Sequence, residues 1–434
     1  MKTRKYLSAS GLFGLVRSGF EKIPDQRTGN VKITLGDALM SGFAMFSLKD
    51  PSLLAFDKRR KQAGNLKRVY RLKDIPCDTQ MRTILDAVDP EEIKPLFKAV
   101  FRQAQRGKVL EKFVFMDGCY LLSVDGTQYF SSQQIHCDSC LEQVNSQTGE
   151  VSYTHQLLGA AIVHPDQQAV IPLAPEPIIK QDGTAKNDCE RNAAKRFFAQ
   201  LRKDHPHLRL IVLQDSLSPN APNIRTLEEH HLHYILRVKE GDHAFLFAQV
   251  AAAHQAGRTT EVEYHDGGVQ QRLRFSNQLP LNKSHPDLLV NFFEYWQFVD
   301  GEITQHFTWI TDFTVTEKNV FQLMRGGRTY WKIENETFNT VKNQGYHLEH
   351  NFGHGQQHLS VVFALLMMLA FLVDQIQQLA DRLLQAVWAQ EGSKKSLWEH
   401  MRSLFYSLPF DSMEDIYRAL LYGYTVEVQI CDSS

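Results

Sequence analysis

The spacing of apolar and polar residues changes along the chain, and the change marks a different predicted structure. Within residues 30–105 the apolar residues recur at helical spacing, and Asp78 is the expected N-cap of one of these helices. From residue 112 onward the apolar runs become short, with β-branched and aromatic side chains bounded by Gly, Pro or polar clusters, which is typical of consecutive strands. The pattern predicts a helical region followed by a β-rich region.

The β-rich region predicts an α/β fold with a mixed central sheet. The first predicted strands are FVFMDG, CYLLSVDGTQYF, HQLLGAAIVHP and AVIPLAPEPI. A helix over residues 188–203 follows, and then the run LRLIVLQD, whose continuous apolar character is typical of a strand buried on both faces. A further helix and strand occupy residues 223–239. Antiparallel strands followed by alternating helices and strands indicate an α/β layer fold.

Residues 240–325 interrupt this alternation with two predicted hairpins, which turn at Gly267-Gly268 and at Asp300-Gly301. We interpret this segment as an inserted β subdomain. One long apolar helix is predicted over residues 359–388, with YTVEV near the end of the chain as an edge strand. The predicted domains are a basic helical region at 1–108, a core at 109–240 and 326–390, the insertion at 241–325 and a C-terminal helical region at 391–434.

Charge is distributed unevenly along the chain. Residues 1–73 contain 16 Lys and Arg and 5 Asp and Glu, a net charge of +11, whereas the whole chain has a net charge of −1. Concentrated positive charge is typical of a surface that contacts nucleic acid, although a solvated basic face has the same composition. The densest basic cluster is Lys58, Arg59, Arg60 and Lys61.

Composition points to a cytoplasmic globular protein. The hydrophobic content of 43% and the charged content of 22% are ordinary for this class. The longest apolar run, Val361 to Val373, is shorter than the roughly 20 residues that a membrane-spanning helix needs. The N-terminal apolar stretch is short and is interrupted by Arg17, so it does not predict a signal peptide.

Six cysteines in a chain of this length predict reduced thiols rather than a disulfide framework. Cys137 and Cys140 are closely spaced, and His136 beside them is a third metal ligand by type. A structural zinc site needs four ligands, and His155 and Cys189 are the remaining candidates. The sequence leaves open whether this group binds zinc.

Three carboxylates stand at positions that predict metal chemistry. Asp125 in SVDGT and Asp215 in LQDSL end apolar runs, and Glu334 lies on a predicted helix in RTYWKIENETFNTVK. Asp117 in FMDG is the alternative first aspartate. Three hard oxygen ligands suit Mg²⁺ chemistry on phosphodiesters. The sequence therefore predicts a metal-dependent enzyme that acts on DNA.

Residues 110–375 resemble the bacterial insertion-sequence transposases of the DDE type that carry a β insertion before the last acidic residue. Their terminal motif is Y-x2-R-x3-E-x6-K, and its centre is often R-W-x-I-E. This chain keeps Trp331, Ile333 and Glu334, and VDGT at Asp125 matches the family's D-G-T. It departs from the motif at three positions: Tyr330 stands in place of the arginine, Gly327 in place of the tyrosine, and Lys342 lies one residue late.

The resemblance implies an RNase H-like core in which Asp125, Asp215 and Glu334 hold two Mg²⁺ or Mn²⁺ ions. It also implies cleavage of double-stranded DNA at transposon ends, strand transfer into target DNA, and a homodimer in a nucleoid-associated complex. Arg328 and Lys342 are the cations expected to clamp phosphates. Two alternatives remain: a domesticated or inactive relative that binds DNA without cutting it, and an RNase H-like nuclease without strand transfer.

Three further groups are assigned by their local sequence. Asp182, Asp188 and Glu190 are interpreted as structural, with Asp188 as a helix cap. The histidines of GYHLEHNFGHG, which are His347, His350 and His354, are expected to contact DNA phosphate, because neighbouring glycines break the helix that a ligand pair would need. Trp331 is expected to be a core aromatic residue, with stacking on a displaced base as the alternative.

Overall fold

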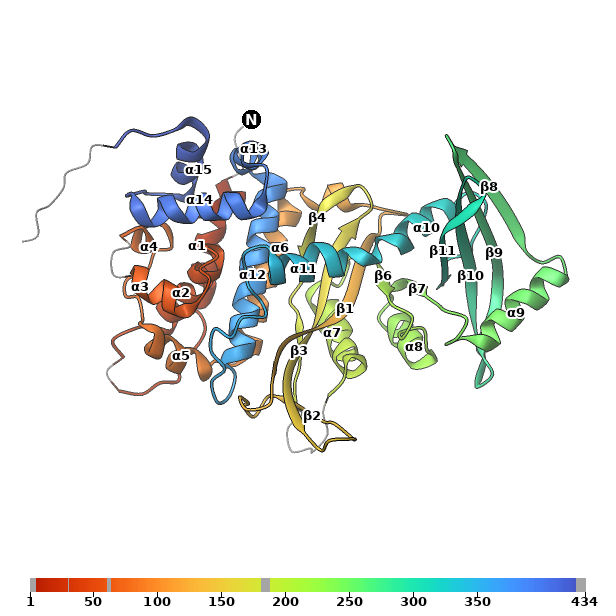
Figure 1. Ribbon diagram of the computed structural model, residues 1–434, viewed down its shortest axis with the longest axis horizontal. Coiled ribbons are helices and arrows are strands. Elements are labelled where there is room, and N and C mark those ends of the chain that lie inside the picture. Colours follow the sequence, from red (N-terminus) through yellow and green to blue (C-terminus); the bar gives the residue numbers. More distant parts are fainter. Residues whose placement is uncertain (1–4, 30, 61–63, 181–187, 427–434) are drawn as a thin grey trace, which may run out of the picture. The chain divides into compact units, whose positions relative to one another are not determined.

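The computed structural model describes residues 5–29, 31–60, 64–180 and 188–426 of the chain (Figure 1). The chain forms two compact units. Unit 1 comprises Met1–Val109, Ile135–Asp138 and Asn339–Ser434, and unit 2 comprises Leu110–Gln134 and Ser139–Phe338.

Unit 1 is helical. Its N-terminal helices are α1 (Ala9–Phe20), α2 (Leu35–Ser47), α3 (Leu53–Arg60), α4 (Gly64–Val69), α5 (Asp78–Asp86) and α6 (Lys94–Arg106), preceded by a 3₁₀ turn, η1 (Lys5–Leu7), and with a second turn, η2 (Pro90–Glu92), before α6. Its later helices are α11 (Asn339–Asn343), α12 (Leu359–Ala380), α13 (Arg382–Glu391), α14 (Lys394–Ser407) and α15 (Met413–Tyr422). Helix α12 packs against α2, α5 and α6, as Figure 1 shows for α2 and α6. By length and composition α12 would suit a membrane, but 94% of its most apolar window is buried inside the protein.

The structure corrects three local predictions in unit 1. The single helix expected over residues 359–388 is broken at Asp381, whose side chain accepts a hydrogen bond from the Leu383 N–H at 2.9 Å and caps α13. The N-cap of α5 is Cys77 rather than Asp78, whose carboxylate instead pairs with Arg82 at 2.5 Å. Residues 424–426 of the predicted edge strand are not in a strand, and the rest of it lies outside the described residues.

Unit 2 is built on a mixed sheet, which confirms the predicted fold class. The strands of its first half are β1 (Tyr120–Ser132), β2 (Leu141–Val144), β3 (Val151–His164), β4 (Gln167–Pro172), β5 (Glu176–Ile178), β6 (Leu210–Gln214) and β7 (His233–Arg237). Strand β3 pairs antiparallel with β1 and β4, while β6 is parallel to both β1 and β7. Helices α7 (Glu190–Asp204) and α8 (Ala221–Glu229) precede and follow β6. Three antiparallel strands joined to two parallel ones agree with the RNase H-like topology expected.

The strands expected as an insertion extend this same sheet. They are β8 (Thr260–Asp266), β9 (Val269–Asn282), β10 (His285–Val299) and β11 (Glu302–Thr311), preceded by helix α9 (Ala244–Gln255), which the sequence pattern did not predict. The predicted hairpin turns at Gly267-Gly268 and Asp300-Gly301 join β8 to β9 and β10 to β11. Strand β11 pairs antiparallel with β7, so the sheet runs in the order β2-β3-β1-β6-β7-β11-β10-β9-β8 (Figure 1).

Candidate active site

Strands β1 and β6 bring two of the predicted carboxylates to the same end of the sheet. The two strands are parallel, and Ser123 is paired with Leu213. Asp125 and Asp215 each come two residues after this pair. The residues before them are buried, whereas both aspartates are half-buried. The register of the two parallel strands thus places the acidic residues at the same level of the sheet, Asp125 within β1 and Asp215 directly after β6.

Local hydrogen bonds orient these two carboxylates. The Gly126 N–H donates to Oδ1 of Asp125 at 2.9 Å. Oδ1 of Asp215 accepts from the Leu217 N–H at 3.1 Å and from the Ser218 hydroxyl at 3.2 Å. The second pattern is an Asx-type turn, which a residue at the end of a strand forms readily. Each aspartate therefore has one oxygen held by groups that follow it directly in the chain.

Glu334, the third predicted carboxylate, lies on a helical segment that packs on the sheet. The segment consists of α10 (Val320–Arg328), the 3₁₀ turn η4 (Thr329–Trp331) and the π-helical turn η5 (Ile333–Phe338), and Glu334 is exposed on η5. A π-helical turn within a helical segment is frequent at functional sites. The Ser123 hydroxyl donates to the Tyr330 carbonyl at 2.9 Å and fixes the segment to β1.

A glycine permits this segment to approach the sheet closely. Gly159 on β3 is the partner of Asp125 on β1. A Cβ atom at Gly159 would lie 2.5 Å from Cε1 of Phe338, the last residue of η5. Any larger residue at this position would push η5 outward, so Gly159 contributes to the placement of the turn that carries Glu334.

Tyr330 is the common neighbour of the three predicted carboxylates. Its hydroxyl shares a hydrogen bond with the Asp125 carboxyl. Burial, followed by the negative charges of Asp125, Asp215 and Glu334, raises the pKa of Tyr330 far above its usual value. In the part of the chain that the structure describes, these three carboxylates do not form a group with all ligand oxygens within 4.8 Å. The charges of all three nevertheless act on the Tyr330 hydroxyl.

Glu190 adds a fourth carboxylate, which the sequence analysis had grouped with structural acidic residues. It is the first residue of α7, and its Oε1 would lie 2.0 Å from a Cβ atom built on Gly126. Burial, and then the charge of Asp215, raise the pKa of Glu190. The sequence held one signal for a functional role of Glu190, which is its position as the first residue of the helix that leads into β6.

The other two members of that acidic group differ from Glu190. Asp188 is buried and forms an ion pair with Arg196 at 2.7 Å, which agrees with a structural role. The N-cap of α7 is Cys189, so the prediction that Asp188 caps this helix was wrong. Asp182 lies outside the described residues.

The crowding of carboxylates changes the acidity of Asp125. Burial is the largest cause that raises its pKa, and the charges of Glu190 and Asp215 raise it further. The hydrogen bonds from Tyr330 and the Gly126 N–H oppose this, and the resulting pKa is about 7. Near neutral pH, Asp125 is therefore poised between its protonated and ionised forms.

These residues open onto a cleft of about 740 Å³. Asp125, Glu190 and Asp215 line it together with Arg191 and Lys195 from the first turns of α7. Both basic side chains are exposed. The cleft thus combines oxygen ligands for a cation with cations for an anionic substrate.

Asp117, the alternative first aspartate, lies elsewhere. The strand expected at FVFMDG is instead a 3₁₀ turn, η3 (Leu110–Phe113), followed by one bridge between Val114 and Tyr120. Asp117 is exposed in a turn before β1 with a φ of 50°. Its charge acts on His233, which pairs with Asp312 at 2.6 Å. Asp117 therefore lies at the start of β1, whereas Asp125 lies further along the strand.

The departures from the family motif have a structural basis. A Cβ atom at Gly327, where the motif has tyrosine, would lie 2.7 Å from Nε1 of Trp309 on β11, so α10 packs on the sheet only with glycine there. Arg328 lies over the rings of Tyr295 and Phe307, 5.5 and 5.8 Å from their centroids.

Trp331 is 45% exposed, so the prediction of a core aromatic was wrong.

The remaining predicted DNA contacts belong to unit 1. Lys58 is exposed on α3, while Arg59 pairs with Asp50 at 2.5 Å and Arg60 with Asp57 at 2.6 Å. Lys342 pairs with Glu349 at 2.9 Å. Lys61 lies outside the described residues. The two arginines are therefore engaged with carboxylates within their own unit.

Comparison with known proteins gives a distant structural likeness. No protein-family model matches the chain. No curated protein matches it either. Among solved structures, the chain is similar to the cryo-EM structure of the piggyBac transposase synaptic complex with hairpin DNA. The sequence identity is 13%, the match covers 97% of this chain and 83% of that chain, and the TM-score is 0.43. A likeness of this degree assigns no chemistry.

Proposed function

We propose that this protein is a DDE-type transposase that cleaves DNA at transposon ends and joins the freed ends to target DNA in a metal-dependent reaction. The observation that carries the proposal is the placement of Asp125 and Asp215, each two residues beyond the paired Ser123 and Leu213 of neighbouring parallel strands. The third carboxylate, Glu334, comes from the helical segment that is fixed to β1, and its charge acts on Tyr330 together with those of Asp125 and Asp215. The family resemblance implies an arrangement of this kind, which supports the proposal.

The donor set fits a divalent metal. Carboxylate oxygens are the ligands that Mg²⁺ and Mn²⁺ prefer. Burial, followed by the charges of Glu190 and Asp215, raises the pKa of Asp125, and a bound cation would favour its ionised form. Asp125, Asp215 and Glu334 would hold the two ions, with Glu190 beside them. When bound, such ions activate a water or a 3′-hydroxyl for attack on a phosphodiester and stabilise the leaving oxygen.

The chain's own residues then position the substrate. The Tyr330 hydroxyl stays protonated and orients Asp125 by its hydrogen bond. Arg191 and Lys195 lie on the cleft, where they would contact DNA phosphates. Trp331 is exposed next to Tyr330, so it is free to stack on a displaced base. Positioning and charge neutralisation supply most of the rate in such phosphoryl transfers.

The same proposal extends to partners and location. The net charge of +11 over residues 1–73 suits recognition of double-stranded transposon ends, for which Lys58 offers an exposed cation. Arg328 and Lys342 are proposed as further phosphate contacts from the family motif. Bringing two DNA ends together calls for a homodimer in the cytoplasmic nucleoid.

A second function is favoured by one observation. Tyr330 and Gly327 replace the arginine and tyrosine of the family motif. A domesticated relative that binds DNA without cutting it would tolerate such changes. A nuclease without strand transfer would keep the carboxylates and lose only the joining step. The three functions predict different products from one DNA substrate.

The test is an assay of cleavage and joining on DNA that carries the ends flanking the gene, in Mg²⁺. The native chain is compared with Glu334→Gln and with the matched control Glu336→Gln, which changes a carboxylate two residues away. We expect cleavage and joining by the native chain and by the control, and binding alone by Glu334→Gln. Binding without cleavage by the native chain would favour the domesticated relative, and cleavage without joining would favour the nuclease.

A further inference from the structure

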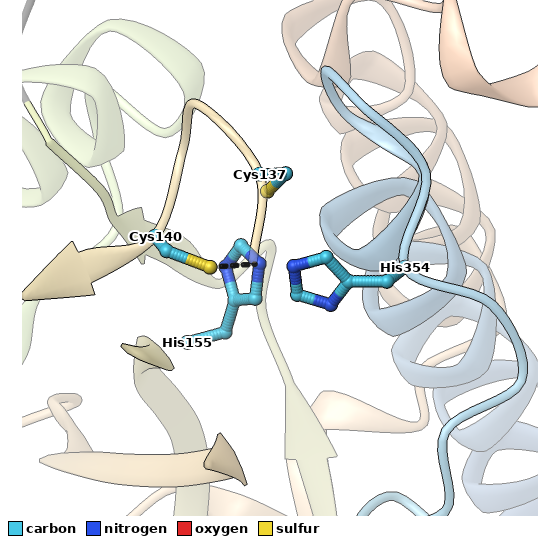
Figure 2. A group of neighbouring side chains, drawn as sticks. All are labelled: Cys137, Cys140, His155 and His354. Carbon is cyan, nitrogen blue, oxygen red and sulfur yellow. Dashed lines mark hydrogen bonds between the residues drawn. The ribbon is translucent and has the colours of Figure 1, made fainter. Parts of the chain in front are cut away.

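We propose that Cys137, Cys140, His155 and His354 bind a structural zinc ion. Cys137, Cys140 and His155 were zinc candidates by sequence, whereas His354 was expected to contact DNA phosphate. The proposal is independent of the proposed transposase activity. It rests on four buried ligand atoms that lie within 4.8 Å of one another, and on the local contacts that hold their side chains. Figure 2 shows the four side chains.

The first pair belongs to unit 2 and is set by sheet register. Strand β2 pairs antiparallel with β3, and Leu141 lies opposite Thr154. Cys140, which precedes Leu141, therefore lies opposite His155, which follows Thr154. Sγ of Cys140 lies 3.5 Å from Nε2 of His155 (Figure 2). Both side chains are buried, with exposed fractions of 2% and 0%.

The ring of His155 is held in place from β1. Tyr129 stacks on it with ring centroids 5.7 Å apart and an interplanar angle of 18°. Phe130 lies opposite His155 in the sheet, and its ring centroid is 5.9 Å from that of His155. These contacts restrict the orientation of the imidazole, and a restricted ligand loses less entropy when it binds a metal.

The second pair, Cys137 and His354, belongs to unit 1. Segment Ile135–Asp138 is part of this unit, and the Asp138 N–H donates to the Gln356 carbonyl at 3.2 Å. Ligand atoms of Cys137 and His354 lie within 4.8 Å of each other. Both side chains are buried. The backbone bond thus holds the cysteine segment beside the loop that carries the histidine.

The loop around His354 has a defined conformation. The Asp86 carboxylate accepts hydrogen bonds from the N–H groups of residues 356–359 at 2.9–3.0 Å, and this lowers its pKa. Gly355 has a φ of 71°, and a Cβ atom there would lie 2.2 Å from Oδ1 of Asp86. Glycine is therefore required where the chain passes this carboxylate. His354 precedes it directly, so its backbone position is well fixed.

The covalent chain ties the two pairs together. Cys137 and Cys140 are separated by two residues, which is the short spacing found in zinc sites with two thiolates from one loop. We infer that one ion takes all four side chains as ligands, since their ligand atoms lie within 4.8 Å of one another.

The ligand chemistry selects zinc. Two thiolates and two neutral imidazoles are a common structural zinc set, whereas Mg²⁺ prefers oxygen donors. Binding converts two thiols to thiolates and releases two protons, so the charge of the ion is cancelled by its ligands. A neutral complex suits buried residues, because an uncompensated buried charge is costly. Four protein ligands leave no open coordination position, so the site is structural rather than catalytic.

Other candidates fit this site less well. His136 is exposed, unlike the four buried ligands. Cys189 lines the carboxylate cleft. Among the described residues, His347 and His350 do not join the group of ligand atoms around Cys137. The structure thus keeps Cys137, Cys140 and His155 from the candidates that the sequence offered and adds His354.

The experiment measures metal content of the full chain purified without added metal. Mass spectrometry should find about one zinc ion per chain, falling below about a tenth in the double variant Cys137→Ser/Cys140→Ser. The matched control Cys77→Ser should keep its zinc. His354→Ala, which leaves both cysteines intact, should weaken zinc retention if His354 is a ligand.

A second measurement covers variants that fail to fold. Native chain reconstituted with Co²⁺ in place of zinc should show thiolate-to-metal charge transfer and the strong visible absorption of a tetrahedral site. Zinc in the native chain, absent from the double variant and replaced by cobalt with this spectrum, supports the proposal. A native chain that retains no zinc and gives no thiolate charge-transfer band with cobalt overturns it.

Discussion

The carboxylate group around Tyr330 and the Cys/His group differ in ligand chemistry and in exposure. The first consists of hard oxygen donors that are half-buried or exposed beside a cleft of about 740 Å³. The second consists of sulfur and nitrogen donors with exposed fractions of 8% or less. A catalytic metal must remain accessible to its substrate, whereas a structural metal is enclosed by its ligands. The carboxylate group would therefore serve a catalytic metal, and the Cys/His group a structural one.

The largest expected effect tests the carboxylate group around Tyr330. Asp215→Asn should lower the rate of DNA cleavage by about 10³-fold or more, because it removes an oxygen ligand where charge develops in the reaction. Zinc content should not change. The measurement is single-turnover cleavage in Mg²⁺ alongside metal analysis of the same sample. Retained activity would remove Asp215 from the site, and a parallel loss of zinc would show that the two groups are not separate.

The next largest effect tests the Cys/His group. Extraction of zinc by a strong chelator should lower the midpoint of thermal unfolding by about 10 °C, since a ligand bound far above its dissociation constant contributes several kcal/mol. Zinc, but not Mg²⁺, should restore the midpoint. Differential scanning calorimetry of native, extracted and reconstituted protein gives the comparison. Restoration by Mg²⁺ alone would contradict a thiolate site.

The two groups also differ in how much of them the sequence revealed. Asp125 and Asp215 were identified because an acidic residue at the end of an apolar run is a local signal, and the family motif pointed to Glu334. The hairpin turns at Gly267-Gly268 and Asp300-Gly301 were local signals too, and both were confirmed. His354 carried no such signal, because its position beside Cys137 depends on packing between segments far apart in the sequence.

The same limit explains the other misses. Glu190 approaches Asp125 only because α7 returns to the sheet beside β1. The break at Asp381 reflects one side-chain cap within an apolar stretch that favours continuous helix. Gly327 looked like a loss from the family motif, and only the ring of Trp309 shows why a side chain is excluded there. Local pattern predicted the elements, and tertiary contact determined these details.

A third prediction concerns the free energy of unfolding, which the burial of Asp125 and its neighbouring charges lower when Asp125 is ionised. Because Asp125 has a pKa of about 7 in the folded chain and an ordinary value of 3.8, the folded state binds more protons between these values. Stability of the metal-free chain should therefore fall as pH rises from about 4 to 7 and stay level above that range. Asp125→Asn removes this dependence and should stabilise the metal-free chain by about 2–4 kcal/mol at pH 8.

Urea unfolding at pH 4 and at pH 8, with the metal removed, measures this effect. The native chain and Asp125→Asn should be similar at pH 4, where the carboxyl is largely protonated, and should diverge at pH 8. An equal difference at both pH values would mean that packing rather than ionisation sets the stability. Saturating Mg²⁺ should reduce the divergence, because a bound cation offsets the repulsion.

A smaller effect is expected where the sheet meets the helical segment. Gly159→Ala should cost about 1–3 kcal/mol, because the added methyl group overlaps the ring of Phe338 and displaces η5. Cleavage should fall with it, since η5 carries Glu334. Gly268→Ala is the matched control: nothing lies within 4 Å of its added Cβ, so a change within about 0.5 kcal/mol is expected. Equal stabilities for the two variants would show that η5 tolerates displacement.

The smallest effect sharpens the role of the fourth carboxylate. The charge of Glu190 raises the pKa of Asp125, so Glu190→Gln should lower that pKa and shift the acid limb of the pH–rate profile to lower pH. Because metal binding needs the ionised form of Asp125, Mg²⁺ should also saturate at lower pH in this variant. The exposed Glu229→Gln, on α8, serves as the control and should leave the profile unchanged. A large loss of rate at every pH, with no shift of the acid limb, would instead make Glu190 a direct metal ligand. The pH profile therefore separates a neighbour that tunes Asp125 from a fourth member of the metal site.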